Sequence, residues 1–408
     1  MAKKEYFFRI LILGFLTALG PFSIDMYLPG FKDIAKDLHT TTNDVALSLS
    51  SFFIGLAAGQ LLYGPLLDKF GRKKPLYVGL MLYIVASVGC MTVTSVNSLI
   101  ALRAVEAIGS CAAAVASMAM VRDLFPVEEN AKVFSLLMII VALSPMLAPA
   151  VGTAITAALG WRWVFVILSA IGLFTLIASI FKLSVSYQPD KSISLKPLPI
   201  ISNFILVFKN PQFYTYVFTG AFAFSGLFAY VAGAPLVLMD VYHLSKDAFG
   251  YIFAGMSVSF IGCSQLNTLV LRKYKSEQIV RVAVVVQVIV GIFFVLFCVF
   301  GWAGLWGILT FIFLSLSCLG FISSNTSALA LAPFARNAGS ASAVLGALQL
   351  GMGSLTSGII GLYKVPNAVP LASIMAVTSA LAAIVLFIGS RNIRQQVEVN
   401  AAETVMVH

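Results

Sequence analysis

Long apolar segments follow one another along the whole sequence, each separated from the next by a short polar stretch. Placing boundaries at the polar stretches gives twelve segments: 7–29, 43–66, 75–95, 98–124, 131–158, 162–182, 211–238, 248–270, 279–300, 303–331, 338–363 and 367–390. Each has about the 20 residues that a helix needs to cross a bilayer, and each is apolar on nearly all faces. The pattern predicts an all-α membrane protein with twelve transmembrane helices.

Composition excludes an ordinary soluble protein. Of the 408 residues, 60% are hydrophobic and only 10% are charged, and the mean hydropathy is +0.98. A soluble domain carries about a quarter charged residues and has no core that could bury so much apolar surface. The net charge of +10 lies in short loops, so we do not expect a nucleic-acid partner. The first 30 residues lack a convincing cleavage site and are not read as a signal peptide.

The distribution of Lys and Arg predicts the orientation in the membrane. Of the 26 such residues, 20 fall on the side of the two termini, one (Arg103) lies inside a span, and five fall on the opposite side: Lys32, Lys36, Arg162, Lys246 and Lys364. Positive residues accumulate on the cytoplasmic side of membrane proteins. Both termini are therefore predicted to be cytoplasmic.

A polar, proline-containing stretch at 183–210 divides the spans into six and six. We expect an N-terminal half at 1–182, a cytoplasmic linker at 183–210, a C-terminal half at 211–390 and a cytoplasmic tail at 391–408. A faint repeat supports the division, because 110–135 and 324–347 both run from a small-residue span through a Phe/Pro turn to a polar segment. Two parallel six-helix halves are a known plan of transporters.

The loop between spans two and three carries the strongest local signal, Gly64-Pro65-Leu66-Leu67-Asp68-Lys69-Phe70-Gly71-Arg72-Lys73-Lys74. Gly64 would allow close helix approach, Asp68 ends the span and Gly71 turns the chain. Asp68 can pair with Arg72 or with the positive N-terminus of a neighbouring helix. Such a contact would exist in one conformation only and would bias a two-state equilibrium. A loop that only orients the protein would explain the cations but not the acid and the glycines.

Three ionisable residues lie clearly inside spans: Asp25, Arg103 and Glu106. A charge at the bilayer centre costs at least ~2.5 kcal/mol and usually faces the bundle interior or a water-filled cavity. Asp25 has no cation within one helical turn, which suits a group that takes up and releases a proton; a solvated, structural Asp is the alternative. Arg103 and Glu106 share one helical face and could simply neutralise each other.

Other polar and aromatic residues within the spans are candidates for lining a substrate cavity: Tyr27, Gln60, Phe222, Phe228, Tyr230, Asn325 and Gln349. The aromatic members could equally pack or face lipid. In span five, small residues at 144, 148 and 152 form a close-packing stripe, and Pro145 and Pro149 are expected to kink the helix. The five cysteines and three histidines are scattered, so neither a metal site nor a disulfide framework is expected.

The motif at 64–74 resembles the G-x-L-x-D-R-x-G-R-[RK] loop of the major facilitator superfamily, with Lys69 in place of the usual Arg. Three further stretches resemble its Bcr/CflA branch of drug:proton antiporters, which includes bicyclomycin and chloramphenicol exporters: 21–29 around Asp25, 120–126 and 160–165. The resemblance covers essentially the whole chain and implies the major facilitator fold. It also implies that Arg103 responds to the charge of a neighbouring acid.

Two positions depart from the pattern of that family. Glu106 stands where Gln is usual, and would be a second protonatable or cation-attracting group. Span five has Ser144, Ala148 and Gly152 where antiporters show more glycines. The second-half copy of the loop, 271–275, keeps its cations but lacks the Asp and Gly.

These features predict a bacterial inner-membrane transporter that exports small hydrophobic compounds in exchange for protons and functions as a monomer. Its partners would be protons, substrate and the lipid bilayer. No cofactor is expected, since the sequence has no phosphate-binding G-x-x-x-x-G-K-[ST] loop. A proton-coupled importer of a small metabolite on the same fold is the alternative. A membrane enzyme or sensor would need a reactive constellation or signalling domain, and we find neither.

Overall fold

Helices make up the protein in the computed structural model, which describes residues 3–125, 127–183, 187, 189, 205, 207–334, 338–363 and 367–393. Within these residues, twelve helical segments are long and apolar enough to cross a membrane. The predicted all-α fold with twelve spans is therefore confirmed. Pro126, most of the predicted linker and residues 394–408 of the predicted tail lie outside the described part of the chain.

The helices group into two compact units, and the division falls between Ile200 and Ile201. It lies inside the linker expected at 183–210. The precise limits of the halves and the linker stay a prediction, because few residues of that stretch are described.

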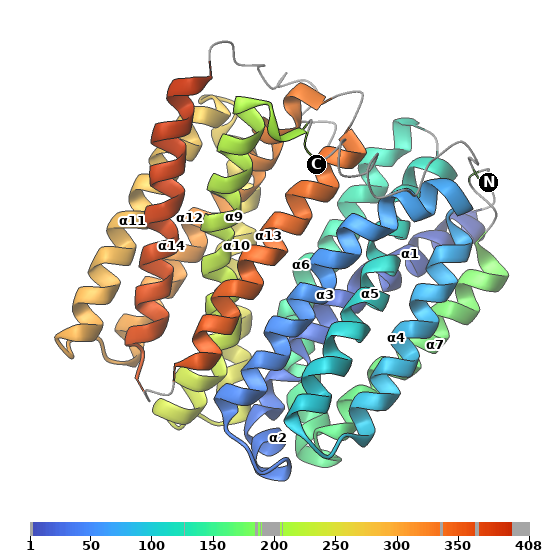
Figure 1. Ribbon diagram of the computed structural model, residues 1–408, viewed down its shortest axis with the longest axis horizontal. Coiled ribbons are helices and arrows are strands. Elements are labelled where there is room, and N and C mark those ends of the chain that lie inside the picture. Colours follow the sequence, from blue (N-terminus) through green and yellow to red (C-terminus); the bar gives the residue numbers. More distant parts are fainter. Residues whose placement is uncertain are drawn as a thin grey trace. The chain divides into compact units, whose positions relative to one another are not determined.

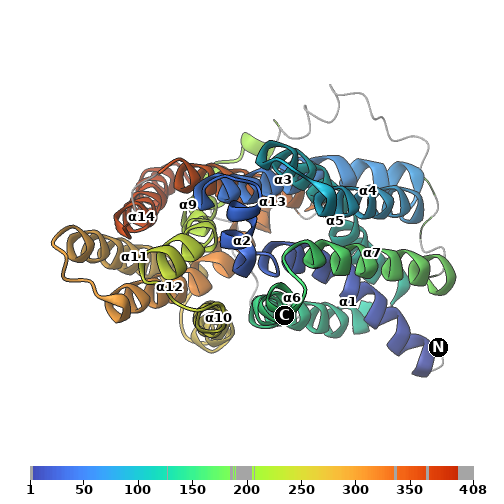
Figure 2. The ribbon, with the colours of Figure 1, turned by 90° about the horizontal axis from the view of Figure 1, so that it is seen from below.

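The first unit contains the six predicted N-terminal spans (Figure 1). Its elements are α1 (Lys3–Asp25), η1 (Leu28–Gly30), α2 (Phe31–Asp37), α3 (Thr42–Phe70), α4 (Lys73–Thr92), α5 (Val96–Leu124), α6 (Val127–Ala158) and α7 (Arg162–Lys182). Helix α5 packs against α3 and α4, and α1 packs against α5, α6 and α7 (Figures 1 and 2). Helices α1 and α5 are thus the central elements of this unit, and they carry all three buried charges predicted from the sequence.

The second unit contains the other six spans. Its elements are α9 (Pro211–Ala234), the π-helix η2 (Pro235–Val241), α10 (Lys246–Val270), α11 (Ser276–Val299), α12 (Leu305–Leu331), η3 (Ala332–Phe334), α13 (Ala338–Leu362), α14 (Val369–Gly389) and η4 (Ser390–Asn392). Helix α9 contacts α12, α13 and α14, while α12 also contacts α10 and α11. Helix α9 is accordingly the most buried span of the protein.

Polar residues set several helix starts. Thr41 and Asp44 form a capping box at the start of α3, in which each side chain bonds the other's backbone N–H. Ser95 caps α5, Asn210 caps α9 and Ser245 caps α10 through bonds to backbone N–H groups. These caps lie at the polar stretches that separate the apolar segments, which is why the predicted boundaries were close to the observed ones.

The first span differs from the expected 7–29. Helix α1 ends at Asp25, and the chain then passes through a turn and η1 before α2. Pro29 accounts for the interruption, because a proline has no N–H to bond the carbonyl oxygen four residues earlier, here that of Asp25, and its ring clashes with that carbonyl. Asp25 is therefore the last residue of a helix and not a mid-helix residue.

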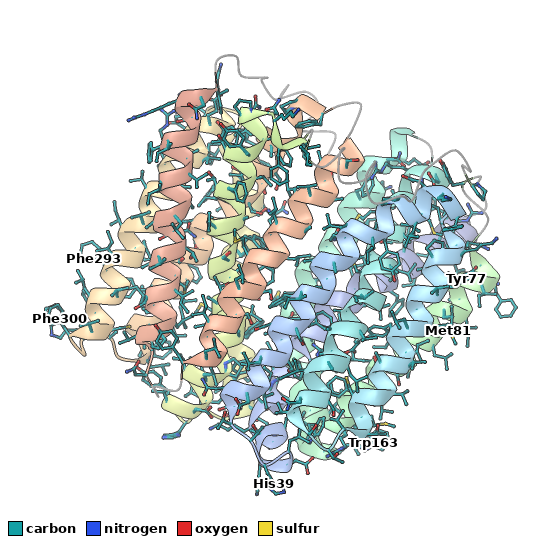
Figure 3. All side chains as sticks on the ribbon, in the orientation of Figure 1. His39, Tyr77, Met81, Trp163, Phe293 and Phe300 are labelled. Atoms are coloured by element: carbon teal, nitrogen blue, oxygen red, sulfur yellow. The ribbon has the colours of Figure 1, made fainter. Side chains whose placement is uncertain are left out.

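Many large apolar side chains of the bundle are exposed. Met81 on α4, Trp163 on α7 and Phe293 on α11 are each about half exposed and point away from the helices around them (Figure 3). Exposed apolar patches of this extent are foreign to a soluble monomer. They are the surface expected of a multi-pass membrane protein, whose outward side chains face lipid tails.

Candidate functional site

Arg103 and Glu106 form an ion pair inside the first unit. One Nη of Arg103 lies 2.7 Å from a carboxylate oxygen of Glu106, and both side chains are completely buried. The other carboxylate oxygen of Glu106 accepts a hydrogen bond from Ser87 on α4, at 2.8 Å. The spacing of Arg103 and Glu106 in the sequence suggested that they could neutralise each other, and the structure shows this ion pair. Ser87 of α4 is an additional hydrogen-bond donor to Glu106.

Arg103 also joins α5 to the end of α1. Its second Nη donates to the carbonyl oxygen of Ser23 at 2.7 Å. Its guanidinium lies 4.5 Å from the ring centroid of Tyr27 and 4.1 Å from that of Phe52. The buried Nε of Arg103 has no hydrogen-bond partner among the described residues. A buried donor without a partner is costly, so this arrangement favours a change of partner.

Asp25 lies two residues beyond Ser23, at the C-terminal end of α1. Its side chain is buried, with 4% of its surface exposed. Among the described residues its carboxylate makes no hydrogen bond and no ion pair. The negative end of the α1 dipole and the absence of a partner both disfavour a charge there. The first unit therefore buries two acids, Asp25 and Glu106, and one base, Arg103, which is paired with Glu106.

Tight packing fixes the backbone around Asp25. A Cβ added to Gly152 of α6 would lie 1.9 Å from the carbonyl oxygen of Met26, so only glycine fits. Tyr27 is buried and shares a 2.6 Å hydrogen bond with Ser48 of α3. The small-residue stripe of α6 thus includes the closest approach of α6 to the end of α1. Helix α6 continues through Pro145 and Pro149, and the kinks expected there stay a prediction.

Arg72 forms a second charged cluster at the loop between α3 and α4. It bonds Asp68 at 2.5 Å and Asp123 of α5 at 2.8 Å. Burial lowers the pKa of Arg72, but the hydrogen bonds to Asp123 and Asp68 outweigh burial and raise the pKa. The expected partner of Asp68 is thus found, and the cluster ties α3, α4 and α5 together at one end of the unit.

The two glycines of this loop behave differently. Gly71 follows the last residue of α3 with φ of 79°, a conformation that glycine adopts without strain. It turns the chain as expected. At Gly64, an added Cβ would meet no atom of the described residues within 4 Å. The close helix approach expected at Gly64 is therefore not found in the described structure.

Most residues predicted to line a cavity are packed inside the units. Asn325 on α12 donates to Asn267 of α10 at 2.7 Å, and Tyr230 stacks on Phe253. The ring of Phe228 occupies the space beside Gly353. Gln60, Phe222 and Gln349 are only half-buried. Of the predicted residues, these three keep part of their side-chain surface exposed.

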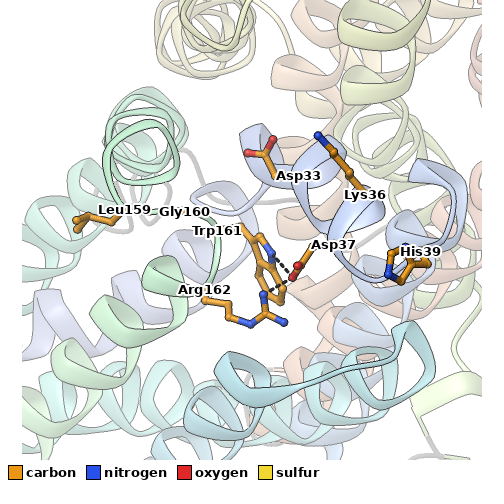
Figure 4. A pocket seen from close by; sticks show the side chains of 8 residues that line it. All are labelled: Asp33, Lys36, Asp37, His39, Leu159, Gly160, Trp161 and Arg162. Carbon is orange, nitrogen blue, oxygen red and sulfur yellow. Dashed lines mark hydrogen bonds and ion pairs between the residues drawn. The ribbon is translucent and has the colours of Figure 1, made fainter.

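A polar pocket of about 470 Å³ lies where α2 meets the turn between α6 and α7 (Figure 4). Its lining residues are Asp33, Lys36, Asp37, His39, Leu159, Gly160, Trp161 and Arg162. Arg162 forms an ion pair with Asp37, and the indole N–H of Trp161 donates to the same carboxylate at 3.1 Å. The sequence stretch 160–165 thus anchors α7 to α2. None of the predicted cavity residues lines this pocket.

The part of the chain that the structure describes contains no candidate metal site. No group of three or more His, Cys, Asp or Glu side chains lies close enough to hold an ion. The five cysteines are free thiols.

Sequence reasoning missed Ser87, the Ser23 carbonyl and Asp123. Ser87 contacts Glu106, and the Ser23 carbonyl contacts Arg103, each from a neighbouring helix. Residue spacing within one helix does not predict such contacts. Asp123 lies inside the 120–126 stretch, and its position at the end of a span, like that of Asp68, was the available signal.

Comparisons with known proteins agree with the resemblance read from the motifs. Residues 13–361 match the model of the Major Facilitator Superfamily. The chain is 31% identical to the bicyclomycin resistance protein homolog of Haemophilus influenzae, over 97% of this chain and 99% of that protein. It is 30% identical to the multidrug resistance protein MdtL of Shigella flexneri, over 84% and 85% of the two chains. The xylose transporter XylE from E. coli, partially occluded and inward open, has the same fold, with a TM-score of 0.71 at 16% identity over 93% and 98% of the chains.

Proposed function

The chain belongs to the major facilitator superfamily, and from this premise we propose that it exports small hydrophobic, drug-like compounds in exchange for protons. Transport of a solute, without chemical conversion, is the activity that the arrangement of its buried groups supports. Asp25, Arg103 and Glu106 of the first unit can change partners. Transport does not require a nucleophile that attacks the substrate.

The observation that carries the proposal is the buried carboxylate of Asp25, which has no partner among the residues that the structure describes. A carboxylate in this position is stable when neutral and costly when charged. Uptake of a proton therefore changes the interactions of the Asp25 carboxyl group more than it would at a solvent-exposed position. A neutral Asp25 is compatible with the Arg103–Glu106 pair, whereas a charged Asp25 would be a second buried anion two residues beyond Ser23, whose carbonyl oxygen Arg103 binds. Protonation is thereby linked to the contacts that hold the end of α1 against α5.

Substrate and proton would then exclude each other at this site. Loss of the proton from Asp25 would favour a rearrangement at Ser23 and Tyr27, next to the place where Met26 lies against Gly152 of α6. A ligand with differential affinity for the two arrangements shifts their populations. Exchange of one proton for one bound compound follows if each stabilises a different arrangement.

The class of substrate is proposed from the relatives and from the half-buried side chains. The two relatives named above are described as bicyclomycin resistance and multidrug resistance proteins, and both are similar to this chain over most of its length. Gln60, Phe222 and Gln349 offer amide and aromatic groups without a fixed charge. Such groups can contact an uncharged compound through hydrogen bonds and through the face of an aromatic ring.

The Asp68–Arg72–Asp123 cluster would serve as the cytoplasmic gate of the first half. This assignment follows from the proposed orientation, with both termini in the cytoplasm of a bacterial cell and the protein in its inner membrane. We further propose that a single chain is the functional unit, since the ion pairs of Arg103 and of Arg72 form inside one unit.

Proton-driven efflux from proteoliposomes tests the proposal. Vesicles loaded with bicyclomycin or chloramphenicol would be placed in a pH gradient, and the same protein would be expressed in a drug-sensitive strain to record its resistance spectrum. We expect uphill efflux that stops when an uncoupler removes the gradient. Uptake of a metabolite down a proton gradient, without any resistance, would contradict export.

A further inference from the structure

Tyr187 lies outside the helices of the first unit, five residues after the end of α7 at Lys182. Its ring contacts the loop that joins α3 to α4. The guanidinium carbon of Arg72 is 4.1 Å from the centroid of the Tyr187 ring. No motif of the sequence connects these two residues, which lie more than a hundred positions apart.

A second contact holds the same backbone against the loop. A Cβ built on Gly71 would lie 3.5 Å from the carbonyl oxygen of Tyr187 and 3.4 Å from a ring carbon of Pro189. Both are ordinary contact distances. Tyr187 and Pro189 therefore rest on the turn between α3 and α4, beside the residue that makes the turn possible.

The contacts of Arg72 divide between the edge and the face of its guanidinium. The edge is taken by carboxylates, since Nη1 bonds Asp68 and Nε bonds Asp123. The face is covered by the Tyr187 ring. The Arg72 side chain is consequently only 11% exposed, although it stands in a loop. Planar guanidinium groups combine these two modes, in-plane ion pairing and stacking on an aromatic face, better than any other side chain.

We propose that Tyr187 is a positioning residue of the gate: its ring holds Arg72 in the plane where it reaches both Asp68 and Asp123. This inference rests on the gating role of that cluster under the proposed function.

The ring contact can be measured without transport. Unfolding equilibria in mixed micelles would be compared for wild type, Tyr187→Leu, Arg72→Gln and the double variant. Leucine keeps apolar bulk but has no aromatic face. A cation–π contact of this exposure is expected to couple the two positions by about 2- to 5-fold in the unfolding equilibrium constant. Additive effects of the two substitutions would overturn the proposal.

Transport then tests the positioning role. Tyr187→Phe keeps the ring and should transport at the wild-type rate, whereas Tyr187→Leu should lower proton-driven efflux by about 2- to 5-fold. The pH at half-maximal rate should stay the same in both, because Asp25 is untouched. Wild-type efflux in Tyr187→Leu, or an equal loss in Tyr187→Phe, would overturn the role of the ring. If wild type itself drives no efflux, the proposed function fails, while the unfolding cycle still decides the contact.

Discussion

Asp25 and Glu106 are two buried acids of one unit with opposite surroundings. Glu106 accepts hydrogen bonds from Arg103 and Ser87, and Asp25 has no partner among the described residues. The same change, acid to amide, should therefore have opposite effects on stability at the two positions. This contrast separates a structural ion pair from a group that is available for protonation.

Glu106→Gln should destabilise the protein. The amide leaves the buried guanidinium of Arg103 without a counter-charge, and removing one partner of a buried ion pair costs about 3–5 kcal/mol. The unfolding equilibrium in mixed micelles measures the loss. Coupling to the pH gradient should remain, because Gln is usual at this position in the family. An unchanged stability would mean that another acid replaces Glu106 beside Arg103.

Asp25→Asn should leave stability unchanged or raise it, since it removes a buried carboxylate that lacks a partner. It mimics the permanently protonated state, so drug binding should change little while uphill efflux disappears. The measurement is efflux from proteoliposomes across a pH series, with Glu106→Gln beside it. If Asp25→Asn still transports uphill with the pH dependence of wild type, Glu106 becomes the coupling candidate.

Residue contacts could be predicted from the sequence only where they are local. The ion pair of Arg103 with Glu106 follows from their spacing along α5, and that of Asp68 with Arg72 from the loop motif. The contacts of Ser87 and Ser23 depend on how α4 and α1 are rotated against α5. Hydropathy that is uniform around each helix gives no information on this rotation. For the same reason, Phe228, Tyr230 and Asn325 could not be recognised as packing residues.

Among the elements, α6 lies close to the end of α1 at Gly152, where an added Cβ would be 1.9 Å from the carbonyl oxygen of Met26. We expect Gly152→Ala to destabilise the protein by about 1–3 kcal/mol, because the new methyl group must displace the backbone. Efflux should also fall, since Met26 adjoins Asp25. Gly262→Ala on α10 is the control: its Cβ would meet nothing within 4 Å, and alanine is the better helix former. Equal stability of both variants would contradict the close packing.

The lengths of the elements were predictable because the segments are bounded by capping residues and charges. The position at which α1 ends was not predictable in this way. Gly20 and Pro21 could have interrupted the helix, but they lie within it, and the helix ends at Asp25. Burial of Tyr27 against Arg103 and its bond to Ser48 stabilise the turn that follows. These are tertiary contacts, and the apolar pattern continues across the break, where Pro29 was the local signal that the predicted span 7–29 did not use.

The cluster at the end of α3, α4 and α5 gives a prediction for Asp68. Its side chain is 48% exposed, so loss of its ion pair should cost at most about 1 kcal/mol of stability. Asp68→Asn should nevertheless slow transport clearly, because under the proposed gating role the contact with Arg72 would form in one conformation only. Efflux rate and melting temperature in detergent are measured together. Normal efflux at normal yield would count against a gating role.

At the scale of the whole molecule, the charges of the loops decide how the protein lies in the membrane. The topology predicted from the sequence puts the loops at Lys69–Lys74 and at Arg272–Lys275 on the side that carries 20 of the 26 Lys and Arg residues. It puts Lys36 and Arg162, which line the pocket beside α2, on the opposite side. Each unit was predicted with six spans, so both termini share the more basic side.

We therefore expect both termini, and the loop at Lys69, to face the cytoplasm. Single cysteines at Lys69 and Val399 should react with a membrane-impermeant maleimide only after the cells are opened, whereas a cysteine at Lys246 should react in intact cells. The variants would be made in a background without the five native cysteines, and Lys246 serves as the control for access of the reagent. The positive-inside rule supplies the reason, since loops rich in Lys and Arg are retained in the cytoplasm. Labelling of the Lys69 or Val399 position from outside would reverse the topology, and the cluster around Arg72 would then gate the outer face.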